Sequence, residues 1–97
     1  MNNRAVLASL HALLHGKVQG VFFRGFVYES AIELGVKGWV RNLPDGVTVE
    51  ICAEGERASL QNLLTRLHQG PPWAQVESIE TQWENYSGKF DKFEVIY

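Results

Sequence analysis

Apolar and polar residues alternate along the first part of the chain, where every second position is apolar: Val6, Ala8, Leu10, Ala12 and Leu14. Successive side chains of a strand point to opposite faces of a sheet, so this spacing predicts a strand with one buried face over residues 6–14. The alternation stops at Gly16, where a segment bracketed by two glycines begins.

In two later segments the apolar residues recur at intervals of three and four, which indicates amphipathic helices. The first stripe consists of Phe23, Phe26, Val27, Ala31 and Leu34. Gly35 follows directly and is placed to end this helix, since glycine adopts the left-handed conformation of a helix C-cap. The second stripe consists of Leu60, Leu63, Leu64 and Leu67, and it stops before Gly70 and the Pro71-Pro72 pair.

Four further segments have the character of strands. Residues 36–42 and 47–53 flank the turn sequence Leu-Pro-Asp-Gly, which predicts a hairpin. Residues 76–84 alternate weakly, and the short segment 93–97 is rich in residues that favour strands. We therefore expect an α+β, ferredoxin-like βαββαβ sandwich, in which two helices cover one face of an antiparallel sheet and a short extra C-terminal strand follows.

Composition restricts the class of protein. A chain of 97 residues can bury its own core, so we expect a single domain over residues 1–97. The net charge of −2 provides no general attraction for nucleic acid or anionic membranes, and any anion must be held by a local site. No apolar run is long enough to span a bilayer and no signal peptide is evident, so we expect a cytoplasmic protein. The single Cys52 excludes an internal disulfide and a metal cluster of several cysteines.

The segment His-Gly-Lys-Val-Gln-Gly-Val-Phe-Phe-Arg, residues 15–24, connects the first predicted strand to the first helix. Its two glycines allow the backbone to curl and to approach a ligand closely. The N–H groups at a helix start lack partners within the helix, and the helix dipole adds positive charge there. Arg24 can offer two parallel donors to phosphate oxygens. These features predict an anion site, although a plain strand-to-helix turn with a surface arginine has the same local pattern.

The same segment resembles the first signature of the acylphosphatase family, which runs glycine, any residue, Val-Gln-Gly-Val, any residue, Phe or Met, and Arg. Every fixed position is filled, by Gly16, Val18, Gln19, Gly20, Val21, Phe23 and Arg24. The second signature is present as Gly38-Trp39-Val40-Arg41-Asn42 followed by Gly46. The two motifs have the separation typical of the family, and the resemblance extends over nearly the whole chain.

One position departs from the family pattern. The valine expected two residues after the last glycine of the second signature is found three residues after Gly46, at Val49, and Gly55 follows six residues later. We interpret this spacing as a one-residue insertion near Val47 and Thr48, which would alter the turn or add a bulge. The insertion lies after Asn42, so we expect the site itself to be intact.

The resemblance implies hydrolysis of the carboxyl-phosphate bond of small acyl phosphates to carboxylate and inorganic phosphate, by attack of water on phosphorus, with no metal and no cofactor. It implies that Arg24 and backbone N–H groups of the loop bind the phosphoryl oxygens, while Asn42 holds the attacking water. The loop positions are Gly16, Lys17, Val18, Gln19, Gly20 and Val21, of which we expect Gln19 to shape the loop. We expect a monomer that acts on a small molecule and binds neither nucleic acid nor a membrane.

Three residues outside the two motifs are further candidates for a functional role. His11 and His15 are four positions apart, which on a strand is about 13 Å and too far to share a metal ion. We expect both on the outer face of the sheet, where His15 could tune phosphate binding. The final strand could also bring the carboxylate of Tyr97 to Arg24, as in some relatives of the family.

Two other classes of function have the same predicted element order. An RNA-recognition domain needs exposed aromatic residues on its central strands and a basic surface, whereas Trp39 is a lone candidate, with packing as its default role. A non-catalytic ligand-sensing or assembly domain would also fit this fold. The presence of both Arg24 and Asn42 favours the enzyme, and phosphate binding without turnover would favour the sensing domain.

Overall fold

The computed structural model describes residues 6–97 of the chain. Its elements are β1 (Leu7–Lys17), α1 (Phe23–Leu34), β2 (Lys37–Asn42), β3 (Val49–Glu56), α2 (Arg57–Gln69), β4 (Gln75–Glu84) and β5 (Phe93–Ile96). The predicted order of strands and helices is confirmed. The largest differences are at element ends, since β1 continues to Lys17 and α2 begins before the leucine stripe, at Arg57.

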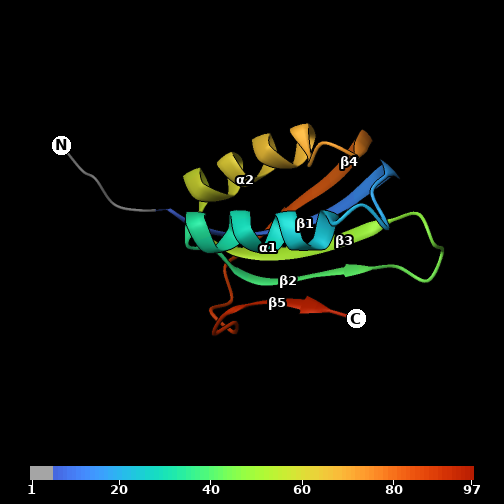
Figure 1. Cartoon of the computed structure of the whole chain (residues 1–97). Helices are drawn as coiled ribbons and strands as arrows, with labels where there is room; N and C mark the ends of the chain where they lie inside the picture. Colours follow the sequence, from blue (N-terminus) through green and yellow to red (C-terminus); the bar gives the residue numbers. More distant parts are fainter. Residues whose placement is uncertain (1–5) are drawn as a thin grey trace.

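The strands form one five-stranded sheet in the order β4-β1-β3-β2-β5, and both helices cover the same face of it (Figure 1). The predicted antiparallel arrangement holds for β1, β2, β3 and β4. The extra strand β5 pairs parallel to β2, so the complete sheet is mixed. The parallel direction arises because the chain re-enters the sheet beside the start of β2, where Phe93 lies opposite Gly38. It then runs along β2 until Ile96 lies opposite Arg41.

The helices divide the sheet between them. α1 packs over β2 and β5, and α2 packs over β1, β3 and β4. Gly35 ends α1 in the left-handed conformation, with φ 71°, as its position in the sequence predicted. Neither helix, in the part of the chain that the structure describes, is long and apolar enough to cross a membrane.

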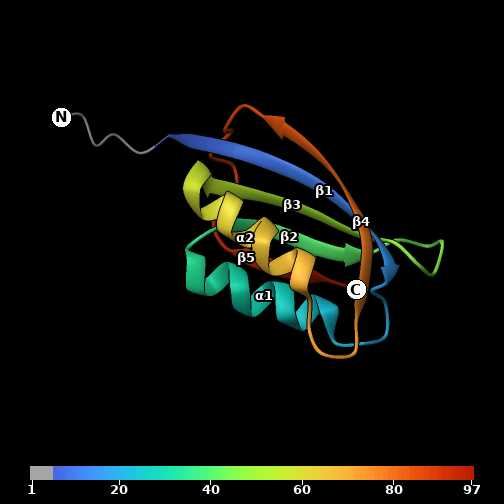
Figure 2. The same ribbon diagram turned by 90° about the horizontal axis from the view of Figure 1, so that it is seen from above.

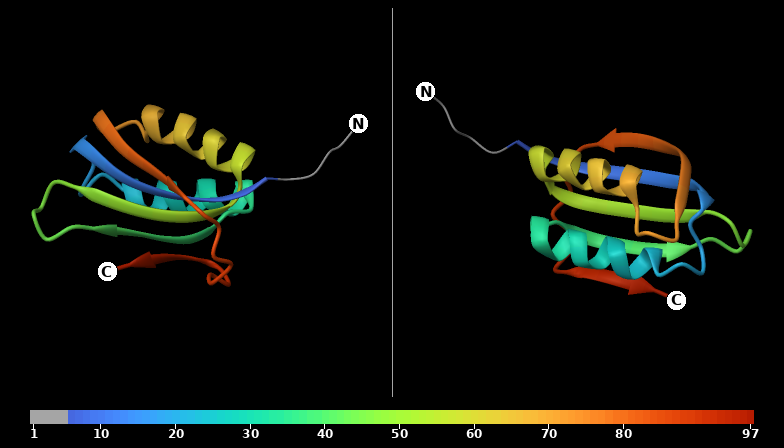
Figure 3. Two further views of the ribbon diagram at one scale, coloured as in Figure 1. Left: turned by 180° about the vertical axis from the view of Figure 1, so that it is seen from behind. Right: turned by 45° about the horizontal axis from the view of Figure 1, so that its top comes forward.

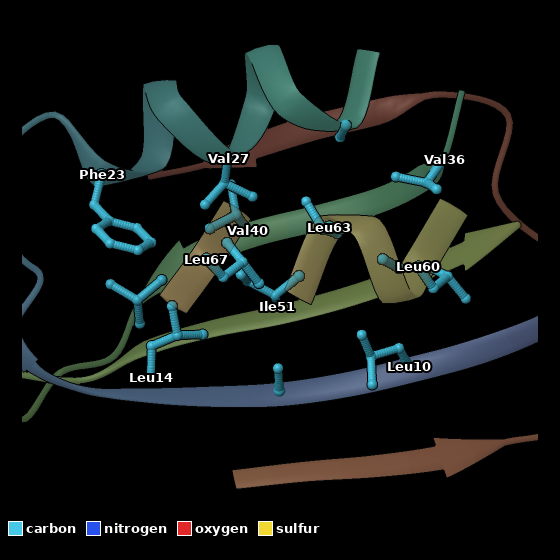
Figure 4. Close-up of a cluster of buried hydrophobic side chains, with 14 of the residues drawn as sticks. Leu10, Leu14, Phe23, Val27, Val36, Val40, Ile51, Leu60, Leu63 and Leu67 are labelled. Atoms are coloured by element: carbon cyan, nitrogen blue, oxygen red, sulfur yellow. The ribbon is translucent and has the colours of Figure 1, made fainter. Parts of the chain in front are cut away.

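The core fills the space between helices and sheet, and Figure 4 shows its largest side chains pointing inward from all of these layers. Leu14 of β1 and Phe23 of α1 are both fully buried in it. Burying a side chain of this size contributes about 1.5–3 kcal/mol. The connection between β1 and α1 therefore starts and ends close to residues anchored in the core, which fixes its position.

Three segments that are far apart in the sequence lie together at one end of the sheet. The β1–α1 connection, the β2–β3 hairpin and the end of β5 lie there together in two different views (Figures 2 and 3). The strand register agrees, because Asn42 at the end of β2 pairs with Val49 and its neighbour Arg41 pairs with Ile96. Both sequence motifs therefore meet at this end of the sheet.

Candidate active site

The backbone between β1 and α1 curls through two residues in the left-handed region. Gly20 has φ 72° and Phe22 has φ 60°, and Phe22 is the one non-glycine residue with positive φ among residues 6–97. Gly16 has a different role from the one expected of a flexible loop residue. It lies at an irregularity in the pairing of β1 with β4, where a Cβ atom would meet the carbonyl oxygen of Gln75 at 2.2 Å. Gly16 therefore allows two strands to approach, and the curled segment proper is residues 18–22.

The start of α1 is open to an anion. Phe22 provides no side-chain cap, and the first turn contains no acidic residue. The first helical hydrogen bond runs from the N–H of Phe26 to the carbonyl of Phe22, at 3.0 Å. The N–H groups that precede Phe26 have no carbonyl to reach within the helix, and they carry the positive end of its dipole. Arg24 adds a full positive charge in this first turn.

Asn42 presents an unpaired acceptor at the end of β2. Its Oδ1 atom is buried and has no hydrogen-bond partner within residues 6–97. A buried acceptor without a partner costs about 1–3 kcal/mol, so such an atom in a folded protein calls for an explanation. A molecule that donates a hydrogen bond to this oxygen would remove the cost.

These groups share one cavity of about 420 Å³. The curled segment, the first turn of α1, the end of β2 and the end of β5 all contribute residues to its lining. The lining residues are Val18, Gly20, Phe22, Phe23, Arg24, Gly25, Asn42, Val95 and Tyr97. A cationic side chain, open N–H groups and an unpaired acceptor thus face the same volume, which suits an anion together with a water molecule.

The predicted loop positions divide into two groups. Val18 and Gly20 line the cavity together with Arg24 and Asn42. Gly16 and Lys17 belong to the end of β1, and Val21 is buried at 8% exposure. Gln19 faces the β2–β3 hairpin, and its Nε2 donates hydrogen bonds to the carbonyl oxygens of Leu43 at 3.2 Å and Thr48 at 2.9 Å. Gln19 thus connects the curled segment to the hairpin that follows Asn42, which supports the loop-shaping role expected of it.

The hairpin loop, residues 43–48, is held by its own hydrogen bonds. The N–H of Leu43 donates to the carbonyl of Thr48 at 2.9 Å, and the Asp45 carboxylate accepts bonds from the Thr48 hydroxyl and from the N–H groups of Val47 and Thr48. These bonds lower the pKa of Asp45 below its usual value. The pairing of β2 with β3 is regular from Lys37 to Asn42, so the unusual spacing of the second motif is absorbed by the turn and adds no bulge.

Arg24 contacts the end of β5. Its Cζ lies 4.7 Å from the centre of the Tyr97 ring, and its Nη1 donates to the carbonyl oxygen of Ile96 at 3.4 Å. The expected approach of the chain end to Arg24 is thus observed, but the ring and a backbone carbonyl make the contacts, and the ion pairs within residues 6–97 do not include the Tyr97 carboxylate. Sequence reasoning did not assign Phe22, Val95 or the Tyr97 ring to the site.

The two histidines lie outside the cavity, on the sheet face that carries no helices. His11 bonds to Glu50 at 2.7 Å, and His15 bonds to Glu80. Each histidine has a different carboxylate partner, in agreement with the prediction that the pair does not act together on one ion.

Comparison with known proteins identifies the family. The acylphosphatase family model matches residues 10–95. The acylphosphatase of Pyrobaculum aerophilum is 50% identical over 90 residues, which cover 93% of this chain and 95% of that protein. The crystal structure of acylphosphatase from Bacillus subtilis has a TM-score of 0.88 at 34% identity, covering 95% of this chain and 100% of that chain. An acylphosphatase structure from Coxiella burnetii has a TM-score of 0.87 at 37% identity, covering 98% and 100%. The chain therefore belongs to the acylphosphatase family, whose enzymes hydrolyse acyl phosphates.

Proposed function

We propose that this enzyme hydrolyses the carboxyl-phosphate bond of small acyl phosphates by attack of a water molecule on phosphorus, without a metal ion or other cofactor. The observation that carries this proposal is the buried, unpaired Oδ1 of Asn42 in the same cavity as Arg24. The cavity offers positive groups for a phosphoryl group and one acceptor for a water beside it.

In this proposal the phosphoryl group lies between Arg24 and the curled backbone. The guanidinium group has five N–H donors in one plane, and one of them bonds weakly to Ile96. The remaining donors, with the N–H groups of the curled segment, residues 18–22, and of the α1 start, bind the phosphoryl oxygens. Val18 and Gly20 line the cavity and contribute the backbone closest to the substrate.

Asn42 positions the nucleophile. Its Oδ1 accepts a hydrogen bond from the attacking water and holds an oxygen lone pair of that water toward phosphorus. An amide does not titrate in the working pH range, so this role needs no pKa adjustment. Orienting a reactant in this way accounts for a large part of catalysis in phosphoryl transfer, where there is little covalent chemistry for the protein to perform.

The leaving group explains why so few catalytic side chains suffice. Cleavage of the P–O bond releases a carboxylate, which is stable at neutral pH and needs no proton from a general acid. The charge on the phosphoryl oxygens is balanced by Arg24 and by fixed backbone dipoles. No cluster of three or more His, Cys, Asp or Glu side chains suited to a metal occurs within residues 6–97. The proposed mechanism assigns charge balance to Arg24 and the backbone.

The test is hydrolysis of benzoyl phosphate in excess chelator by the wild type and two variants. Arg24→Ala should lower kcat/KM by about 10³-fold or more and abolish inhibition by inorganic phosphate. Asn42→Ala should lower kcat by about 10²-fold while inorganic phosphate still inhibits. Near-normal turnover by Asn42→Ala would refute the water-positioning role, and loss of wild-type activity in chelator would refute the metal-free mechanism.

The open face of the sheet gives no support to the RNA-binding alternative. The central strands β1 and β3 present His11, Glu50 and the nearly buried Glu54 on that face, and Glu50 is engaged by His11 and Arg41. Trp39 lies on β2, where the Arg41 guanidinium stacks on its ring at 5.1 Å. We propose that residues 1–97 form one catalytic domain, monomeric and cytoplasmic, that binds a small acyl phosphate.

A further inference from the structure

Phe22 is an unusual residue at its position. Its ring is 87% exposed, although phenylalanine gains stability by burial. Its backbone is left-handed, with φ 60° and ψ 25°, a conformation that costs a residue with a Cβ atom about 1–2 kcal/mol. Glycine would relieve this strain with little loss of buried surface. Neither the backbone nor the core explains a phenylalanine here, but Phe22 lines the cavity that contains Arg24.

Tyr97 is the second exposed ring at this cavity, at 97% exposure. The Cζ atom of Arg24 lies over its ring, 4.7 Å from the ring centre. A cation–π contact of this kind still leaves N–H donors of the guanidinium for a phosphoryl group. The ring therefore lies beside the volume in which Arg24 would hold a phosphoryl group.

We propose that Phe22 and Tyr97 form a subsite for the acyl group, which selects substrates with an uncharged aromatic or bulky apolar acyl group over acetyl phosphate. This inference rests on the proposed function, since it assumes that the phosphoryl group binds at Arg24. The acyl carbon is joined to phosphorus through one oxygen, so the acyl group must occupy the part of the cavity next to that site. Phe22, Tyr97 and Val95 line the same cavity as Arg24.

The charge of the subsite defines the acyl groups that it excludes. Arg24 is the one charged side chain that lines the cavity in the described part of the chain. In the proposed complex this side chain is already bound to the phosphoryl group. An acyl group with its own carboxylate or phosphate would find no second cation beside the rings. An aromatic acyl group would instead meet two aromatic side chains, and such pairs favour offset or edge-to-face contacts.

The experiment measures kcat/KM for benzoyl phosphate and for acetyl phosphate and takes the ratio of the two values. The ratio of each variant is then divided by the ratio of the wild type. This double ratio cancels the different intrinsic reactivities of the two acyl phosphates. Phe22→Asn removes the ring and keeps a residue that tolerates the left-handed backbone, whereas Phe22→Tyr keeps a ring. Tyr97→Ala removes the second ring. Tyr86→Asn is the matched control, because Tyr86 is an exposed tyrosine in the connection between β4 and β5, at the opposite end of the sheet.

We expect the ratio to fall about 2- to 10-fold in Phe22→Asn and in Tyr97→Ala, the range that one aromatic contact provides. Phe22→Tyr and the Tyr86 control should keep the wild-type ratio. An unchanged ratio in both Phe22→Asn and Tyr97→Ala would overturn the subsite. An equal loss with both substrates would also overturn it, since that result describes a residue that only shapes the loop or positions Arg24.

A binding measurement separates this inference from the proposed function. Phenacylphosphonate and acetonylphosphonate carry a methylene in place of the bridging oxygen, so neither can be hydrolysed at that position. The wild type should bind phenacylphosphonate more tightly, and Phe22→Asn should reduce that preference by the same 2- to 10-fold. If the phosphonates show this pattern but neither acyl phosphate is hydrolysed, the subsite stands and the proposed function fails. If both acyl phosphates are hydrolysed but the phosphonates bind equally well, the subsite fails alone.

Discussion

The Gln19 side chain is the most direct connection between the curled segment and the hairpin, and replacing it tests how the site is held together. Its Nε2 donates to the carbonyls of Leu43 and Thr48, which follow Asn42 in the chain. Gln19→Ala removes both bonds and keeps the backbone. Gln19→Glu keeps the size of the side chain but replaces two donors with an acceptor that faces two carbonyl oxygens.

The structure sets the size of the effect. Two ordinary hydrogen bonds contribute about 1–3 kcal/mol to the free energy of unfolding. The two carbonyls keep other partners, since Thr48 accepts from the N–H of Leu43 at 2.9 Å and Leu43 accepts from the N–H of Gly46 at 3.3 Å. Removing Gln19 therefore leaves neither oxygen unpaired, so we expect a loss of about 1–2 kcal/mol for Gln19→Ala. Gln19→Glu should lose at least as much at neutral pH, because the carboxylate repels both carbonyls.

Urea denaturation measures this loss, and benzoyl phosphate hydrolysis measures its consequence for the site. A shift of the curled segment relative to Asn42 should lower kcat by about tenfold or more, since small misplacements of reacting groups are costly. Gln61→Ala, at an exposed position of α2, is the control and should change neither quantity. Full stability and full kcat in both Gln19 variants would refute the bridging role.

Two further predictions concern the frame around the site. A Cβ on Gly38, where φ is 140°, would meet the Cys52 carbonyl oxygen at 1.9 Å, whereas a Cβ on Gly46, where φ is 80°, would meet nothing within 4 Å. Gly38→Ala should therefore cost more than about 3 kcal/mol and Gly46→Ala about 1–2 kcal/mol in chemical denaturation, and equal costs would contradict the argument. Burial pushes the pKa of Glu54 up, but hydrogen bonds from the Ser87 hydroxyl and from the N–H groups of Ser87 and Gly88 outweigh it, so its pKa lies below the ordinary 4.5. A lowered pKa stabilises the fold above pH 4.5, and that stability is lost as the pH falls through the folded-state pKa. The stability difference between wild type and Glu54→Gln should therefore shrink on acidification below pH 4.5, and a constant difference from neutral to strongly acidic pH would show that the contacts of Glu54 are not linked to its charge.

The helices and strands could be predicted from the sequence wherever burial of one face makes apolar residues recur at a regular spacing. The leucine stripe of α2 and the alternation of β1 exist because one face of each element packs into the core, and the C-cap at Gly35 has a clear local signal. The motifs likewise placed Arg24 and Asn42, which the structure brings into one cavity. Their roles there remain predictions.

Other features have no local signal. The direction of β5 depends on where the chain returns after β4, which a short apolar segment does not encode. The sequence predicts a loop at Gly16, but this residue lies in β1. A glycine is needed there because the backbone of β4 approaches too closely for a Cβ atom. Phe22 is left-handed although phenylalanine disfavours that region, so no propensity could indicate it. The sequence pointed to the Tyr97 carboxylate, whereas the structure places the ring against Arg24.

The parallel pairing of β5 with β2 also has a consequence for how this enzyme folds. It brings Ile96 to Arg24 across 72 positions of the chain, so the cavity has no complete wall until nearly the whole sequence has been organised. Closing so long a loop costs conformational entropy before any contact compensates for it. Chains dominated by such non-local contacts fold more slowly than helical bundles of the same size. We therefore expect catalytic competence to be gained late in folding, when the edge strand β5 docks.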